Sequence, residues 1–68
     1  MLEVFEHIRQ EVKDTAEVAW NLTMAQHTPA EAANLLNTIV EYYSLIWTKE
    51  EVDFLRFYFQ MRMEMMKK

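Results

Sequence analysis

The 68-residue sequence contains no cysteine, no glycine and a single proline. Without cysteine it cannot form disulfides or thiolate zinc sites, and it has no cysteine nucleophile. Tight β-hairpin turns depend on residues that adopt positive φ, chiefly glycine and asparagine, so an all-β fold is not expected. Alanine, glutamate, leucine, methionine and lysine are common, and all of them favour helices. The composition therefore predicts an all-α protein.

Long apolar runs and an excess of basic residues are also missing. No apolar run approaches the roughly 20 residues that a membrane-spanning helix needs. The first ten residues, MLEVFEHIRQ, lack the basic start and apolar centre of a signal peptide. The formal net charge of −4 disfavours non-specific binding to nucleic acid or anionic membranes. We therefore expect a cytoplasmic protein, and we disfavour nucleic acid and membranes as its partners.

Apolar residues, by contrast, make up 51% of the chain and include six methionines. A domain of this length buries a smaller fraction of its surface than a larger one, so it is marginally stable alone. Disulfides are absent, and two histidines without cysteine give little support to a structural metal. Oligomerisation is then the most economical additional source of stability. We expect one helical domain over residues 1–68, without a cofactor, that assembles as a helical-bundle homodimer.

Apolar residues at spacings of three and four predict three helices, over residues 2–26, 29–47 and 49–66. The short connection between the first two makes them antiparallel neighbours. The apolar stripe of the first helix consists of Val4, Phe5, Ile8, Val12, Ala16, Ala19 and Leu22, widened by Leu2 and Trp20. The stripe of the second consists of Ala32, Leu35, Leu36, Ile39, Val40, Tyr43, Ile46 and Trp47, with Tyr42 at its margin.

Two segments have the sequence of a capping box, which marks the start of a helix. Thr28 precedes the proline and is followed three residues later by Glu31, so both side chains can bind free N–H groups of the first turn. Thr48 and Glu51 repeat this spacing. Because no glycine, proline or asparagine ends the second helix, a single kinked helix over 29–66 is an alternative. Three separate helices are preferred because they bury more of their own surface.

The last helix carries apolar residues on two faces. Val52, Leu55, Phe59 and Met66, with Met63 beside them, lie roughly opposite a second set spaced four, three and four residues apart. One face can close the core, whereas the other would form an apolar patch that monomers seldom tolerate. The sequence does not decide which face is intramolecular. We predict a protein interface formed by Phe54, Tyr58, Met61 and Met65.

Few residues suggest chemistry. Glu3, His7 and Glu11 share one face of the first helix, but this face is opposite the apolar stripe, whereas metal sites in bundles point inward. We expect it to be a solvated acidic face and no metal site. His27 is expected near the end of the first helix, where a cation interacts favourably with the helix dipole. Ser44 is the only serine, and no glycine-rich phosphate loop exists, so we do not expect an enzyme.

The leading hypothesis is a small, non-catalytic interaction or regulatory protein that presents a helical surface to another protein, of a kind often encoded by bacteria or phages. One alternative is a DNA-associated regulator, which binds DNA directly or imitates its charge through the acidic face of the first helix. Another is a purely structural assembly subunit. Direct DNA reading is disfavoured because Glu50, Glu51 and Asp53 would occupy the start of the recognition helix, where they would repel phosphate.

Overall fold

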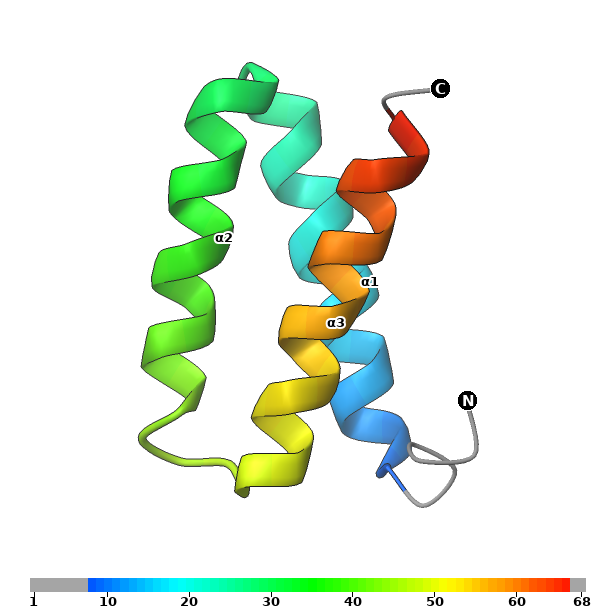
Figure 1. The fold of residues 1–68 in the computed structure, drawn as a ribbon, viewed down its shortest axis with the longest axis vertical. Helices are drawn as coiled ribbons and strands as arrows, with labels where there is room; N and C mark the ends of the chain where they lie inside the picture. Colours follow the sequence, from blue (N-terminus) through cyan, green and yellow to red (C-terminus); the bar gives the residue numbers. More distant parts are fainter. Residues whose placement is uncertain (1–7, 67–68) are drawn as a thin grey trace.

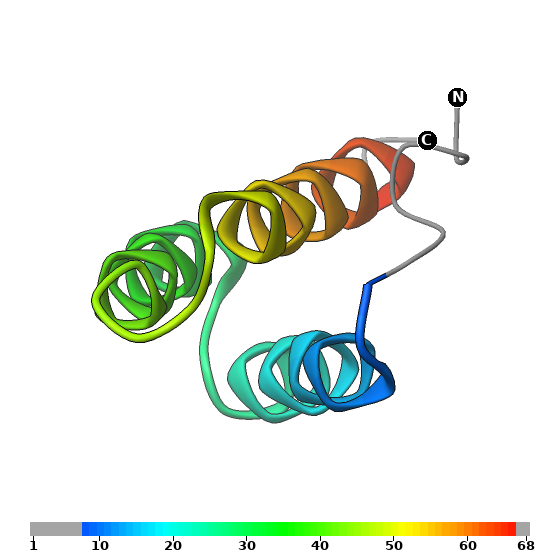
Figure 2. The ribbon, with the colours of Figure 1, turned by 90° about the horizontal axis from the view of Figure 1, so that it is seen from below.

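The computed structural model describes residues 8–66, which form three α-helices: α1 (Gln10–Gln26), α2 (Pro29–Tyr43) and α3 (Lys49–Met66). Each helix packs against the other two. α2 runs antiparallel to α1 and α3 (Figure 1), and in the view from below α1 lies beneath the layer formed by α2 and α3 (Figure 2). The predicted all-α, three-helix fold is confirmed. Within residues 8–66, no helix combines the length and apolar character needed to cross a membrane.

The core is built from one row of side chains on each helix. Residues three or four apart lie on one side of a helix; the rows of α1 and α2 are spaced by four throughout, and the row of α3 by three and four. Ala16 and Ala32 are fully buried, where a larger side chain would force the helices apart. Leu55 is also fully buried. The rows are Val12, Ala16 and Trp20 in α1, Ala32, Leu36 and Val40 in α2, and Val52, Leu55 and Phe59 in α3.

The first helix begins later than predicted. α1 starts at Gln10, and Arg9 precedes it with extended backbone angles of φ −60° and ψ 146°. No side chain caps this end, so no local capping motif marks Gln10 as the start of the helix. Ile8 is buried, although it is not part of the helix. Three predicted stripe residues, Leu2, Val4 and Phe5, lie outside the described residues.

The buried side of α1 also differs from the prediction. Trp20, predicted at the edge of the stripe, is 4% exposed, whereas Leu22 is 57% exposed. The prediction for Leu22 was wrong because the helix turns the indole of Trp20 inward, and an aromatic ring buries more apolar surface than a leucine. Thr23 is buried as well. With Trp20 turned toward the core, Leu22 and the neighbouring Val18 lie on the outer side of α1.

The second helix ends at Tyr43 rather than at Trp47. The amides of Leu45 and Ile46 donate to carbonyl oxygens three residues earlier, at 3.1 Å each, which tightens the chain into a turn. The ring of Trp47 stacks on that of Tyr43 with centroids 4.1 Å apart. No residue within 8–66 has positive φ, so this turn needs no glycine. Ile46, predicted in the buried stripe, is 60% exposed because it lies in the turn.

Both predicted capping boxes are present. At the start of α2, the hydroxyl of Thr28 accepts from the amide of Glu31, and the carboxylate of Glu31 accepts from the amide of Thr28. Thr48 and Glu51 make the same two contacts at the start of α3, at 3.2 and 3.1 Å. These contacts satisfy N–H groups that a helix start otherwise leaves unpaired. The predicted start of the third helix is therefore confirmed.

Glu51 has a second role that its counterpart Glu31 lacks. Arg9 Nε donates to Glu51 Oε2 at 2.7 Å, and Arg9 Nη2 lies 3.5 Å from Oε1. The side chain of Glu51 is 11% exposed. The hydrogen bond from Arg9, together with the backbone N–H of Thr48, lowers the pKa of Glu51 below its ordinary value. Arg9 thus links the start of α1 to the start of α3 through an ion pair with Glu51, whose ionised carboxylate the fold stabilises.

The pair of capping boxes allows a controlled test of this ion pair. Because the pKa of Glu51 is lowered in the folded state, its contribution to stability is present above the ordinary value of 4.5 and is lost as the pH falls through the lowered pKa. Glutamine preserves a capping box but removes the charge. We expect Glu51→Gln to lower the thermal midpoint at neutral pH more than Glu31→Gln, as measured by circular dichroism. In acid, well below pH 4.5, the two variants should behave alike; a difference that persists there would contradict the assignment.

Candidate interaction surfaces

The fold places the four predicted interface residues on one side of α3. An adjoining side of the helix, with Val52, Leu55 and Phe59, points into the core. Met66 was grouped with these residues from its spacing, but it is 48% exposed and lies in the last turn, at the edge of a groove between α1 and α3. We refer to the predicted set as the α3 face; it consists of Phe54, Tyr58, Met61 and Met65.

The α3 face has a fixed aromatic part and an exposed methionine part. Phe54 and Tyr58 are half-buried and pack against the edge of the core, with ring centroids 6.1 Å apart. Met61 and Met65 are 38% and 62% exposed. A rigid aromatic base beside flexible, polarizable side chains can adapt to the shape of a protein partner.

Arg62 lies against one ring of this face, that of Tyr58. Its guanidinium carbon lies 5.3 Å from the ring centroid of Trp20 on α1 and 5.8 Å from that of Tyr58 on α3. At these distances a cation is attracted to the face of an aromatic ring. Arg62 therefore covers the edge of the core between α1 and α3, and it positions Tyr58 from the side.

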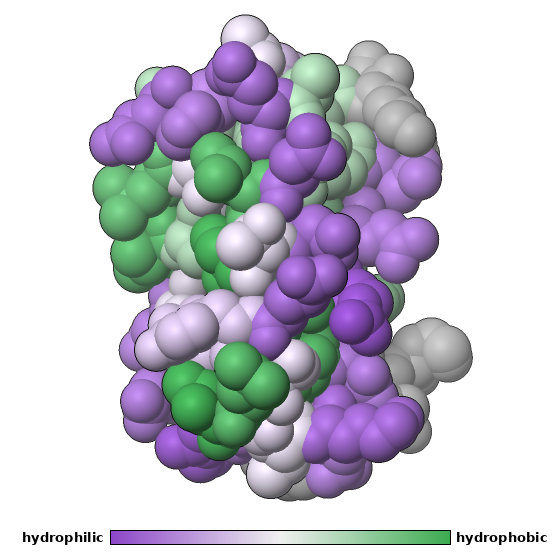
Figure 3. Space-filling model, turned by 90° about the vertical axis from the view of Figure 1, so that its left-hand side faces the viewer, coloured by the Kyte–Doolittle hydropathy of each residue, from purple (hydrophilic) through white to green (hydrophobic). Residues whose placement is uncertain are grey.

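A second apolar surface, which sequence reasoning missed, lies over α1 and α2. We call it the α1–α2 face; Val18 and Leu22 are one helical turn apart on α1, and Leu35 and Tyr42 are two turns apart on α2. Their exposed fractions are 54%, 57%, 38% and 59%. A shallow hollow lined by Asp14, Thr15, Val18, Ala19 and Tyr43 joins the two helices here. The space-filling view shows apolar side chains gathered in patches on this side of the molecule (Figure 3).

The sequence did carry a signal for this second surface. The apolar stripes predicted for the first two helices include Leu22 and Leu35, and Tyr42 lies at the margin of the second. These stripes are wider than a three-helix unit can cover. Each helix turns only part of its stripe inward, so the remainder faces outward over α1 and α2.

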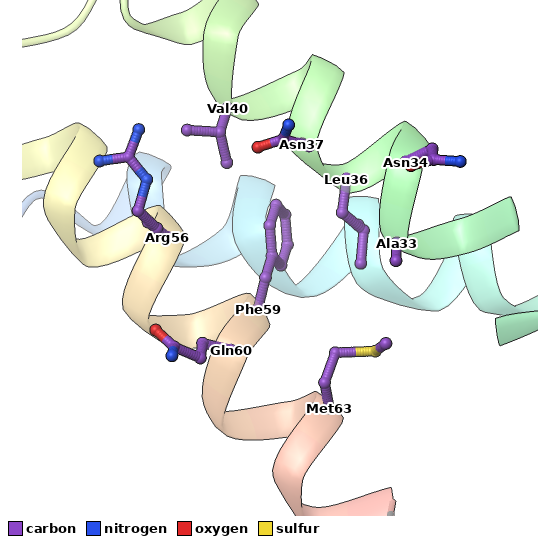
Figure 4. A pocket seen from close by; sticks show the side chains of 9 residues that line it. All are labelled: Ala33, Asn34, Leu36, Asn37, Val40, Arg56, Phe59, Gln60 and Met63. Atoms are coloured by element: carbon purple, nitrogen blue, oxygen red, sulfur yellow. The ribbon is translucent and has the colours of Figure 1, made fainter. Parts of the chain in front are cut away.

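A third feature is a depression between α2 and α3. The ring of Phe59 points into it from α3, with Leu36 and Val40 from α2 on the other side, and polar side chains including Arg56 and Gln60 lie around it (Figure 4). Its volume of about 250 Å³ is smaller than the roughly 300–1,000 Å³ of typical small-molecule sites. It is an opening over the core between α2 and α3.

The histidine and carboxylate residues are not gathered into a site in the part of the chain that the structure describes. No three His, Cys, Asp or Glu side chains within residues 8–66 are placed to hold a metal ion. Of the acidic set on the first helix, Glu3 and His7 lie outside the described residues, and Glu11 accepts a hydrogen bond from Arg9 at 3.2 Å. His27 Nδ1 donates to the carbonyl oxygen of Thr23 at 3.1 Å, which places the ring at the end of α1 as predicted.

Comparison of the chain with known protein families, with curated proteins and with solved structures gives no match. The two apolar surfaces differ in one important respect: the α3 face belongs to a single helix, whereas the α1–α2 face spans two.

Proposed function

We propose that this chain is a small, non-catalytic interaction protein that acts as a homodimer paired through the α3 face. One observation carries the proposal: α3 fills the core with one apolar side and leaves Met61 and Met65 exposed on the other, beside half-buried rings. Contact between such a patch and water is unfavourable, and an extended apolar patch commonly marks an interface. A second copy of the chain would cover it symmetrically.

The charges on α3 are compatible with pairing to itself. The helix contains three basic residues, Lys49, Arg56 and Arg62, and four acidic residues, Glu50, Glu51, Asp53 and Glu64. Because positive and negative residues are interspersed, pairing two copies of α3 does not bring a cluster of like charges against the same cluster of the other copy. Such an arrangement would cost binding free energy. The small size of the domain adds a reason for pairing, since dimerisation increases the apolar area that the fold buries.

Direct reading of DNA receives less support from the same helix. Recognition helices contact the major groove with their first residues, and here the first turn contains Glu50 and Glu51. The carboxylate of Glu51 is held by Arg9 and by the amide of Thr48. An acidic first turn engaged within the fold favours a protein partner over a phosphate backbone.

Light scattering coupled to size-exclusion chromatography tests the proposal directly. We expect a species of twice the 8.3 kDa chain mass at micromolar concentrations, with dissociation on dilution if the pairing is weak. A mass equal to one chain up to the solubility limit would contradict the homodimer.

A further inference from the structure

The α1–α2 face differs from the α3 face in the charges that surround it. Asp14 lies one turn before Val18 and lines the hollow between the helices, and Glu31 lies one turn before Leu35. Asp14 accepts a hydrogen bond from the side-chain amide of Gln10, and Glu31 accepts one from a backbone N–H. Both donors are neutral, so neither of these hydrogen bonds pairs a carboxylate with a cation.

The basic residues of the described range lie away from the α1–α2 face. α2 contains no lysine or arginine. The single basic residue within α1, Lys13, is five positions from Val18, or about 140° around the helix at 3.6 residues per turn. Arg9, just before α1, is bound to Glu51 and Glu11. The remaining basic residues within the described range, Lys49, Arg56 and Arg62, are all on α3. The surface over α1 and α2 is therefore apolar with an acidic border.

We propose that the α1–α2 face binds a basic amphipathic helix of another protein. Such a helix would lie along the hollow between α1 and α2, as a fourth helix against the three-helix unit. Its apolar residues would cover Val18, Leu22, Leu35 and Tyr42, in the manner by which amphipathic helices fill apolar grooves. Its lysine or arginine side chains would meet Asp14 and Glu31, and this charge complementarity would favour basic partners over acidic ones.

A second copy of the chain is a poorer occupant of the same surface. Symmetric pairing through the α1–α2 face would bring the Asp14 and Glu31 side chains of both copies towards one another. Like charges brought together at an interface cost free energy and exclude such pairings. The helices of this chain also offer no strongly basic side, because the lysine and arginine residues of α3 are interspersed with acidic ones.

Designed peptides provide the test. Three synthetic peptides of four helical turns would be titrated into the full-length chain: an amphipathic one with leucine and lysine, one with glutamate at every lysine position, and a scrambled leucine–lysine peptide without an apolar side. We expect the amphipathic lysine peptide to bind at least tenfold more tightly than either control in calorimetry, and its affinity to fall with added salt. Amide shifts in NMR spectra should concentrate in α1 and α2.

Matched variants locate the binding site. The double variant Val18→Gln/Leu22→Gln should weaken the lysine peptide at least tenfold, whereas Leu45→Gln, at a position that is 82% exposed in the α2–α3 turn, should not. The double variant Asp14→Asn/Glu31→Gln should reduce the salt dependence of the affinity for the lysine peptide.

Equal binding of the scrambled peptide, or NMR amide shifts that map to α3, would overturn the proposal. The light-scattering mass of the free chain is independent of these outcomes, so failure of the homodimer and failure of this site are distinguishable.

Discussion

Replacing Leu55 by alanine is expected to lower the free energy of unfolding by about 3 kcal/mol, within the roughly 2–5 kcal/mol typical of buried leucine truncations. Leu55 is fully buried among side chains from all three helices. Alanine removes apolar contacts and leaves a cavity that three packed helices can close only in part. For a domain of this size, each kcal/mol corresponds to about 4–8 °C in thermal midpoint. The shift should therefore exceed about 10 °C.

The control for this experiment is the same substitution at Leu45. That side chain is 82% exposed in the turn between α2 and α3, so Leu45→Ala should change the free energy of unfolding by no more than about 0.5 kcal/mol. Both variants would be unfolded thermally at one fixed chain concentration, because dimerisation makes the midpoint depend on concentration. Similar losses in the two variants would mean that Leu55 is not the centre of the core.

Features that are encoded within a few residues were predictable from the sequence. The starts of α2 and α3 follow from Thr28 with Glu31 and from Thr48 with Glu51, since each pair satisfies its own helix end. The two-sided character of α3 follows from spacing alone. The capping signals act over one turn and the spacing acts within one helix, so none of them needs knowledge of what packs against the helix.

Features that depend on distant residues were not predictable. The start of α1 is marked by Arg9, whose guanidinium contacts Glu51, 42 residues further along the chain. The choice of Trp20 over Leu22 as the buried residue of α1 depends on the neighbouring helices and on Arg62, which covers the indole. Periodicity identifies an apolar stripe, but it does not fix which edge of the stripe the rest of the fold covers.

The same distinction applies to the two candidate surfaces. The α3 face lies on one helix, so the spacing of its members along the sequence is enough to group them. The α1–α2 face exists only because Val18 and Leu22 lie beside a second helix that also leaves apolar residues uncovered. Its acidic border likewise combines Asp14 from α1 with Glu31 from α2. A composite surface of this kind depends on how two helices pack, which periodicity within either helix does not specify.

Placing two negative charges on the α3 face should abolish dimerisation. In the double variant Met61→Glu/Met65→Glu, a symmetric seam would bury four carboxylates, two from each copy, among apolar side chains. Burial of unpaired charges is strongly unfavourable. We expect the dissociation constant to rise at least a hundredfold, about 3 kcal/mol, as measured by sedimentation equilibrium. Folding of the single chain should be little affected because Met61 and Met65 are exposed.

The matched control places the same charges on the other surface. Val18 and Leu22 are also one turn apart, and both are more than half exposed. The double variant Val18→Glu/Leu22→Glu therefore adds the same net charge without touching the α3 face. If the α3 face is the seam, this control should dimerise almost as tightly as the unchanged chain, because its new carboxylates remain in water. If the control dissociates and the methionine variant stays dimeric, the seam lies over α1 and α2. The acidic border of that surface would then have to be accommodated within the dimer.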